Sequence, residues 1–547
     1  MNLKEKPFDL TDEQIAKIAE TVASLTMEEK VGQLFCVMGG DFSPEQLKDI
    51  VAQGRCGGVL YRPTADGETI AKWFEPLDKA AKIPLLKAAN LEEGGSGGRS
   101  DGTLFGWPML TAATDDPDTA EMFGKVCGVE GAQCGINWTF SPVCDLNLNL
   151  QNPITNVRTF GSDQARVEEM TKRYVEGLEK QGVKACAKHF PGDGVDYRDQ
   201  HLHPTVNSLS AEEWYASYGK IYTNLIEGGL SSIMVGHIAA PYVAKDANPD
   251  LTEEEMYMPA TLSRTLLTDV LRGKLGFNGL ITTDATIMAG FTTAMARCDA
   301  LPAAIMAGAD MLVFNTDFEE DYGYLLAAAQ DGRLSAERLD EAVTRVLALK
   351  EITCNSGIVP EAVDGPSEHR KAADRSITLV KNLEPDVFPV TPERYPQILL
   401  IPLGIDNILD GSVTQLMKEA LEKEGFEVEV YSEDADDMHG TASLSRSRLT
   451  LHVANMEHYS NQTTIRLQWV SKHALNVPRF PNEEPDIFVS LANPYHLQDV
   501  PRVRTYINAY TATKDVIELV VEKLMGKSEF KGVSPVDAFC GMPDTRL

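Results

Sequence analysis

The sequence predicts an α/β protein in which a TIM-like (β/α)₈ barrel is followed by a smaller α/β sandwich domain. Short apolar segments alternate with helical patterns over residues 34–351, and a second alternation of the same kind begins after residue 375. The chain has 547 residues, of which 43% are hydrophobic and 24% are charged. A globular chain of this length can form two or three hydrophobic cores.

The first alternation contains eight strand candidates, each of which is a short apolar run. They lie at 34–37, 58–61, 84–88, 136–140, 183–187, 232–235, 279–282 and 311–314. Helical patterns such as 164–181 and 262–275 separate them, and Thr26 with Glu29 forms a capping box ahead of another helix. Eight strands that alternate with helices fit a (β/α)₈ barrel with long loops, and a doubly wound open sheet is the alternative.

The pattern changes after the helical segment 336–351, where glycine and proline become frequent. We therefore expect the barrel at 1–352, a linker at 353–374 and the carboxyl-terminal sandwich domain at 375–547. Its strand candidates lie at 377–380, 398–401, 426–430, 449–453, 487–491 and 505–507.

The composition excludes several classes of protein. The formal charge of −31, from 50 Lys and Arg against 81 Asp and Glu, would repel a phosphate backbone, so we expect no nucleic-acid partner. The amino terminus lacks the apolar core of a secretion signal, and no run of about 18 apolar residues occurs, so we expect a soluble cytoplasmic protein without a membrane partner. The nine scattered cysteines fit reduced thiols. The sequence does not predict the oligomeric state.

Residues 188–194, with the sequence Lys-His-Phe-Pro-Gly-Asp-Gly, have the composition of a catalytic loop. Asp199 and His201 follow closely. Proline and glycine end the strand candidate 183–187, so the polar groups lie at its carboxyl end, where α/β enzymes carry out their chemistry. A solvated surface loop is the alternative for any one of these residues.

Several segments in the same order resemble family 3 glycoside hydrolases, and in particular their β-N-acetylglucosaminidase branch. The marker is Lys-His-Phe-Pro-Gly at 188–192 with an Asp-x-His pair at 199–201. Further similar segments are Thr-Met-Glu-Glu-Lys-Val-Gly-Gln at 26–33, the region 141–161 with Ser-Pro-Val-Cys-Asp-Leu-Asn, Gly-Phe-Asn-Gly-Leu-Ile-Thr-Thr-Asp at 276–284, and the second-domain segments 376–382 and 493–495. The resemblance covers nearly the whole chain.

The resemblance implies three catalytic residues. Cleavage with retention needs a nucleophile and a group that acts first as an acid and then as a base. Asp284, at the end of an apolar strand, is the expected nucleophile, although a helix cap is its alternative role. His201 is the expected acid and base because imidazole titrates near neutral pH, and Asp199 would fix its tautomer.

The resemblance also implies residues that hold the sugar. We expect Lys188, His189 and Arg158 to contact its hydroxyl groups, with salt bridging or loop anchoring as their alternative roles. His237, at the end of the sixth strand candidate, is a further candidate by position. Asp145 is expected to brace the loops.

Three departures from the family pattern affect the sugar site and the loop. The third strand of many relatives is followed by Asp-x-Glu-Gly-Gly, and Leu91 occupies the Asp position here, so we expect Asn90 or Glu92 to take over its contacts. Asp193 replaces the His of the closest branch, and Gln200 replaces a common Ser. No catalytic group is lost.

The sequence thus predicts a glycoside hydrolase, namely a retaining exo-β-N-acetylglucosaminidase that cleaves terminal β-linked GlcNAc from cell-wall or chitin fragments through a glycosyl-aspartate intermediate. We expect a small carbohydrate substrate and neither a metal nor an organic cofactor. A phosphorylase acting on β-N-acetylglucosaminides or β-glucosides is the alternative, with inorganic phosphate as acceptor. Two further alternatives are a metal-dependent barrel hydrolase, with ligands from 193–203, and a non-catalytic glycan-binding relic.

Overall fold

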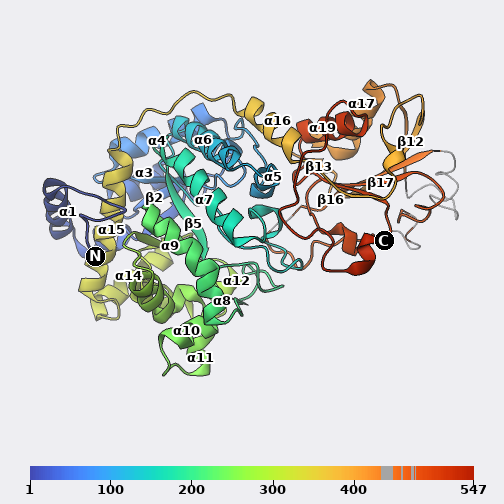
Figure 1. Ribbon diagram of the computed structural model, residues 1–547. Helices are drawn as coiled ribbons and strands as arrows, with labels where there is room; N and C mark the ends of the chain where they lie inside the picture. Colours follow the sequence, from blue (N-terminus) through green and yellow to red (C-terminus); the bar gives the residue numbers. More distant parts are fainter. Residues whose placement is uncertain (433–447, 458–459, 470–473, 475) are drawn as a thin grey trace. The chain divides into compact units, whose positions relative to one another are not determined.

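A computed structural model describes residues 1–432, 448–457, 460–469, 474 and 476–547 (Figure 1). The chain divides into two compact units. The first comprises Met1–Phe105, Ala120–Asn152 and Gln164–Gly365, and the second comprises Gly106–Thr119, Pro153–Asp163 and Pro366–Leu547. The first unit holds a closed eight-stranded barrel and the second a six-stranded sheet, so the predicted fold class is confirmed.

The barrel is built from the eight predicted strands, all parallel to their neighbours. They are β1 (Phe35–Met38), β2 (Gly58–Leu60), β3 (Leu86–Ala89), β4 (Trp138–Thr139), β5 (Lys184–Phe190), β7 (Ser232–Val235), β9 (Leu280–Ala285) and β10 (Met311–Val313). Pairing of β1 with β10 closes the barrel, with Phe35 opposite Leu312, and this closure excludes the open doubly wound sheet. The strands read as continuous apolar runs because both of their faces are buried.

Helices alternate with these strands and surround the barrel in Figure 1. They are α1 (Asp12–Ser24), α2 (Met27–Gly32), α3 (Pro44–Ala52), α4 (Gly67–Ala80), α6 (Pro117–Gln133), α7 (Gln164–Glu179), α8 (Ala211–Ala216), α9 (Tyr218–Gly228), α10 (Pro241–Ala247), α11 (Glu253–Met256), α12 (Ala289–Thr292), α13 (Arg297–Ala307), α14 (Phe318–Asp331) and α15 (Ala336–Cys354). The predicted capping box is present, since Thr26 and Glu29 bond reciprocally at the start of α2. The predicted helix at 262–275 is a π-helix, Thr265–Lys274.

The second unit contains a mixed sheet in the order β11-β18-β17-β16-β12-β15. Its strands are β11 (Thr378–Asn382), β12 (Gln397–Gly404), β15 (Glu427–Val430), β16 (Leu449–Asn455), β17 (Asp486–Ser490) and β18 (Thr505–Asn508), and its helices include α5 (Pro108–Ala113), α16 (Gly365–Ser376), α17 (Val413–Lys423) and α19 (Lys514–Leu524). Only β11 runs antiparallel to its neighbour among these strands. Leu399, Ile401 and Phe488 belong to the hydrophobic core of this unit.

The structure divides the chain differently from the predicted domain bounds in two places. The linker was expected at 353–374, but α15 continues to Cys354 and α16 begins at Gly365, so only 355–364 lies between helices. Two segments from within the predicted barrel range, 106–119 and 153–163, cluster with the second unit. Backbone bonds explain this, because Val533 donates to Ala113 at 2.9 Å and Ser162 donates to Pro535 at 3.2 Å.

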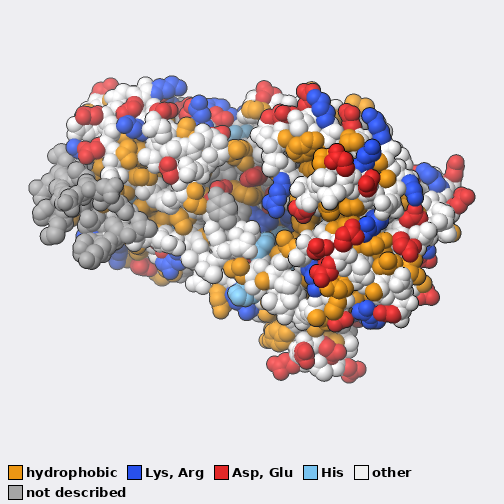
Figure 2. All heavy atoms as spheres, turned by 180° about the vertical axis from the view of Figure 1, so that it is seen from behind, with side chains coloured by type: hydrophobic (Ala, Val, Ile, Leu, Met, Phe, Trp, Pro, Cys, Tyr) orange, Lys and Arg blue, Asp and Glu red, His pale blue; other side chains and the backbone are white. Residues whose placement is uncertain are grey.

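All nine cysteines are free, and seven of them are buried. Within the described ranges, no helix is long and apolar enough to cross a membrane. Figure 2 shows acidic side chains scattered over the viewed face, interspersed with Lys and Arg.

Candidate active site

The candidate active site lies at the carboxyl ends of the barrel strands. Strand β5 continues beyond its predicted end at Ala187 and carries Lys188 and His189, and β9 carries Asp284. The pairing of β5 with β7 shifts register between Ala187 and Phe190, where these polar residues occur. In the barrel order β9-β7-β5, only β7 separates the two strands, so residues that are distant in the sequence lie at the same end of the barrel.

Asp284 is surrounded by potential cations. Burial by itself raises the pKa of this carboxyl group, but His189, His237, His201 and Lys188 together outweigh burial and hold its pKa below the ordinary value. The Asp284 Oδ1 atom also accepts a hydrogen bond from the Ala285 N–H at 2.7 Å. The carboxyl group is therefore ionised at neutral pH.

His201 and Asp199 form the expected imidazole–carboxylate pair. The His201 Nδ1 atom lies 2.7 Å from Asp199 Oδ1, and the His201 backbone N–H donates to the same oxygen at 2.8 Å. Since a carboxylate accepts, Nδ1 carries a proton and Nε2 is left for proton exchange. The Asp199 side chain is fully buried, whereas the His201 side chain is 22% exposed and can reach a ligand.

A second imidazole–carboxylate pair adjoins Asp284. His189 Nδ1 lies 2.7 Å from Asp145 Oδ2, and its Nε2 lies 3.9 Å from Asp284 Oδ2. Asp145 also accepts the His189 backbone N–H at 3.1 Å. The sequence indicated that Asp145 braces loops, but it did not reveal that the residue orients an imidazole next to the nucleophile candidate. The one feature of the sequence that could have pointed to this role is the position of Asp145 after the fourth barrel strand.

Lys188 and Glu92 form an ion pair from β5 and the loop after β3. Lys188 Nζ also lies 3.4 Å from Asn90 Oδ1. Leu91 is fully buried, and its backbone N–H donates to Thr139 Oγ1 at 3.1 Å. Of the two residues expected to take over the lost Asp contacts, Glu92 brings a carboxylate to Lys188 and Asn90 an amide oxygen.

His237 is buried and both of its ring nitrogens are bonded. Nδ1 lies 2.9 Å from Thr261 Oγ1, and Nε2 lies 3.1 Å from the Ala285 carbonyl oxygen. Burial lowers the pKa of His237, although Asp284 opposes this effect. Both ring nitrogens are therefore occupied by protein partners rather than left for the predicted sugar contact. Through the Ala285 carbonyl oxygen, His237 instead supports the backbone next to Asp284. Thr261 was not identified from the sequence.

Arg158 belongs to the second compact unit, in the 3₁₀ segment Asn156–Arg158. Its Nη1 atom lies 3.5 Å from the Ile154 carbonyl oxygen. Its contact with the sugar stays a prediction.

The loop that was considered for metal ligands has other partners. Asp196 forms an ion pair with Arg198 at 2.7 Å, and Asp199 is bonded to His201. In the described part of the chain, no group of three or more His, Cys, Asp and Glu side chains is placed to hold a metal ion.

Known proteins resemble this chain, and some of them do so over nearly its whole length. A β-N-acetylglucosaminidase/β-glucosidase of Cellulomonas fimi is 42% identical over 570 aligned positions that cover 100% of both chains. A β-hexosaminidase of Tolumonas auensis is 31% identical over 51% of this chain and 80% of its own. Among solved structures, a β-glucoside phosphorylase bound to 2FGlc is 43% identical, with a TM-score of 0.93 and 99% of each chain covered.

Residues 26–349 match the glycosyl hydrolase family 3 amino-terminal domain. A family 3 β-N-acetylglucosaminidase from Paenibacillus sp. str. FPU-7 shares the fold, with a TM-score of 0.79 at 24% identity over 95% of this chain and 100% of its own. The matched range contains the whole barrel and every barrel residue of the candidate site. The chain therefore belongs to glycosyl hydrolase family 3 and is an enzyme that acts on glycosides.

Proposed function

We propose that the enzyme is a retaining, exo-acting β-N-acetylglucosaminidase that forms a covalent glycosyl intermediate on Asp284. The observation that carries this proposal is the position of an ionised, buried carboxylate among His189, His201 and Lys188, with His201 held by Asp199. Two chemical roles are needed for retention, and these residues supply both.

In the first step, an Asp284 carboxylate oxygen attacks the anomeric carbon, and the bond to the leaving-group oxygen breaks. The His201 imidazolium gives its Nε2 proton to that oxygen, so the alcohol leaves neutral. Asp199 accepts the hydrogen bond from Nδ1 and stabilises the imidazolium.

In the second step, neutral His201 takes a proton from water while the water oxygen attacks the anomeric carbon. The bond to Asp284 breaks, and the sugar leaves with its original β configuration. One imidazole therefore serves as acid and then as base, because imidazole as a chemical group can both donate and accept a proton.

The sugar is held by Lys188, Glu92 and His189. The Lys188–Glu92 pair presents both donors and acceptors to hydroxyl groups, and His189 directs Nε2 toward the region beside Asp284. The name of the Cellulomonas fimi relative, a β-N-acetylglucosaminidase/β-glucosidase, supports GlcNAc as the sugar, and the Tolumonas auensis relative is named a β-hexosaminidase.

Phosphorolysis is the second candidate, and one observation favours it. The acid/base group is an imidazole, whereas a carboxylate base about 4 Å from a phosphate would cost roughly 4 kcal/mol at an effective dielectric of about 20, or nearly three decades in rate. A neutral base avoids this repulsion. The 43% identical structure that is named a β-glucoside phosphorylase supports the same acceptor.

Product analysis in phosphate and in an inert buffer separates the two candidates. Aryl β-glycosides of GlcNAc, GalNAc and glucose are the substrates, and the anomeric form of the first product is recorded. Free β-GlcNAc at equal rates in both buffers supports the hydrolase. Sugar 1-phosphate as the main product in phosphate, with slow turnover in the inert buffer, would establish the phosphorylase instead.

A further inference from the structure

The Gln200 side chain lies between the two residues of the catalytic dyad in sequence but turns into the protein. It is fully buried. Its Oε1 atom accepts the His237 backbone N–H at 2.9 Å, and its Nε2 donates to Asp193 Oδ2 at 3.2 Å. One amide therefore ties the dyad loop both to the residues that follow β7 and to those that follow β5.

Asp193 is the other end of this connection. Its Oδ1 atom accepts from Asn152 Nδ2 at 2.9 Å and from the Gly194 N–H at 2.6 Å. Its own backbone N–H donates to Asp145 Oδ1 at 2.8 Å, and Asp145 is the partner of His189. Asp193 thus contacts the Asp199–His201 loop through its side chain and the second imidazole pair through its backbone N–H.

The backbone around Gln200 has little room to move. The Ala289 N–H donates to the His201 carbonyl oxygen at 3.0 Å, at the start of α12. A Cβ atom at Gly290 would overlap the Gln200 carbonyl oxygen. Beyond the dyad, β6 (Thr205–Val206) pairs with β8 (Ile238–Ala239), so the loop is held both at Gln200 and after it.

We propose that Gln200 and Asp193 form a latch that positions the Asp199–His201 dyad at Asp284. This inference rests on the proposed function, because it assumes that His201 is the acid and base. Gln200 and Asp193 are positioning residues, since they contact the loop and the strand ends through hydrogen bonds and act through His201.

The chemistry of the two side chains is matched. An ionised Asp193 offers only acceptors, and all three polar groups that face it donate, namely Gln200 Nε2, Asn152 Nδ2 and the Gly194 N–H. Burial raises the pKa of Asp193 to about 6, and the negative charge of Asp145 adds to this while His189 opposes it.

Protonation of Asp193 would set an O–H against one of those donors and weaken the latch below about pH 6. The other titratable group that faces this residue is Tyr218 on α9, whose hydroxyl group donates to the Asp193 carbonyl oxygen at 2.5 Å. That bond is independent of the carboxyl charge.

The latch joins two of the departures from the family pattern noted in the sequence. The closest branch has His at the position of Asp193, and Ser is common at the position of Gln200. A Ser side chain lacks the length to bridge Asp193 and the His237 backbone, so we infer that the two residues act as a pair in this chain.

Exchanging the two functional groups tests the pair. In Asp193→Asn an amide N–H faces Gln200 Nε2, and in Gln200→Glu two carboxylates face each other, so each single variant breaks the latch. The double variant Asp193→Asn with Gln200→Glu restores every donor and acceptor with one negative charge. We expect each single variant to lose about 100-fold in turnover of an alkyl β-GlcNAc, the size of an acid/base contribution, and the double variant to recover at least 10-fold.

Accumulation of the covalent glycosyl intermediate distinguishes a defect in positioning His201 from a general loss of structure. With a dinitrophenyl glycoside, whose leaving group needs little protonation, we expect Gln200→Ala to keep the first step and to stall in the second. Intact-mass spectrometry would then show one sugar attached at Asp284, together with a lowered KM. The exposed Gln330 on α14 provides the matched control Gln330→Glu, with wild-type turnover.

Wild-type turnover in the three single variants Asp193→Asn, Gln200→Glu and Gln200→Ala would overturn the latch. A double variant that melts at the wild-type temperature but recovers no turnover would also overturn it. Failure of the proposed function looks different, because Asp284→Asn would then remain active and no variant would accumulate a glycosyl adduct.

Discussion

His189 Nε2 lies 3.9 Å from Asp284 Oδ2, while Asp145 holds the other nitrogen of the same imidazole at 2.7 Å. The first distance is too long for a hydrogen bond, so the interaction between the imidazole and the nucleophile candidate is electrostatic. Asp284 is thus flanked by two imidazole–carboxylate pairs, one from β5 and one from the loop that follows it.

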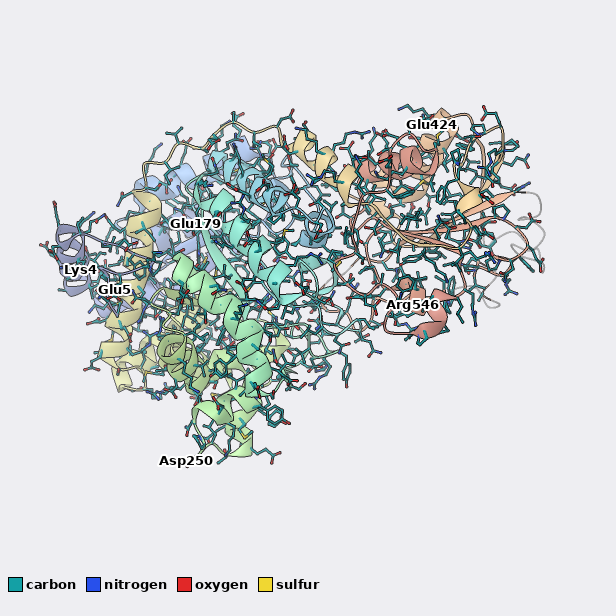
Figure 3. All side chains as sticks on the ribbon, viewed as in Figure 1. Lys4, Glu5, Glu179, Asp250, Glu424 and Arg546 are labelled. Atoms are coloured by element: carbon teal, nitrogen blue, oxygen red, sulfur yellow. The ribbon has the colours of Figure 1, made fainter. Side chains whose placement is uncertain are left out.

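Removal of the Asp284 carboxylate should abolish turnover. We expect Asp284→Asn to lose roughly four orders of magnitude in kcat/KM, because the covalent step has no nucleophile. In Asp284→Gly, added azide should restore cleavage of an activated aryl glycoside and yield the α-glycosyl azide, which NMR identifies. The control Asp250→Asn alters an exposed residue between α10 and α11 and should match the wild type (Figure 3). A β-azide product would contradict attack by Asp284.

The pH at which kcat/KM falls on acidification should depend on the cations around Asp284. Its pKa is lowered because His189 and its other cationic neighbours outweigh burial, and only the ionised carboxylate attacks. His189→Ala removes one cation and raises this pKa, so on acidification the variant should begin to lose kcat/KM at a higher pH than the wild type does. An unchanged acid limb, measured on an activated glycoside, would contradict this electrostatic role.

A buried ion cluster should stabilise the barrel. Asp310 accepts from Arg272 at 2.6 Å, from Arg338 at 2.7 Å and from the Ile281 N–H at 2.9 Å, and Arg345 lies 3.4 Å away. We expect Asp310→Asn to lower the free energy of unfolding by about 3–5 kcal/mol, because three guanidinium groups lose their shared anion.

The pH dependence of the same carboxylate has a defined sign. Burial raises the pKa of Asp310, but the arginines lower it by more, so its folded value lies below the unfolded one. Its contribution is therefore present above about pH 4 and lost on further acidification through the folded pKa. Urea denaturation at pH 7 and at about pH 3 measures the effect. Asp331→Asn, at an exposed ion pair with Arg333, is the control that should change little.

Lys350 should destabilise the folded protein at neutral pH. Burial lowers its pKa to about 8, and its Nζ atom donates to Gln33 Oε1 at 2.6 Å. Between about pH 8 and 10.5 the unfolded chain binds a proton that the folded chain has released, so stability should rise with pH by about 3 kcal/mol from this group. In Lys350→Met this rise should be absent, as denaturant melts of both proteins across that range would show. An identical slope in both would disprove the assignment.

The amino-acid sequence by itself determined the order of strands and helices along the chain. Each barrel strand is a short apolar run closed by glycine, proline or polar residues, and local composition suffices to mark such a run. It also placed Asp284, Lys188 and His189 at strand ends, and Asp199 and His201 in the loop beyond one of them, where a parallel barrel carries its chemistry. Their catalytic and sugar-binding roles stay predictions.

Only the tertiary structure decided which of these side chains meet. The bonding of His237, the ion pair of Glu92 with Lys188 and the link between Gln200 and Asp193 depend on where separate strands end in the closed barrel. The assignment of 153–163, with Arg158, to the second unit likewise depends on bonds to residues far along the chain. Local patterns carry no information on such pairings, because the spatial proximity of distant segments comes from strand order and chain closure rather than from the composition of either segment.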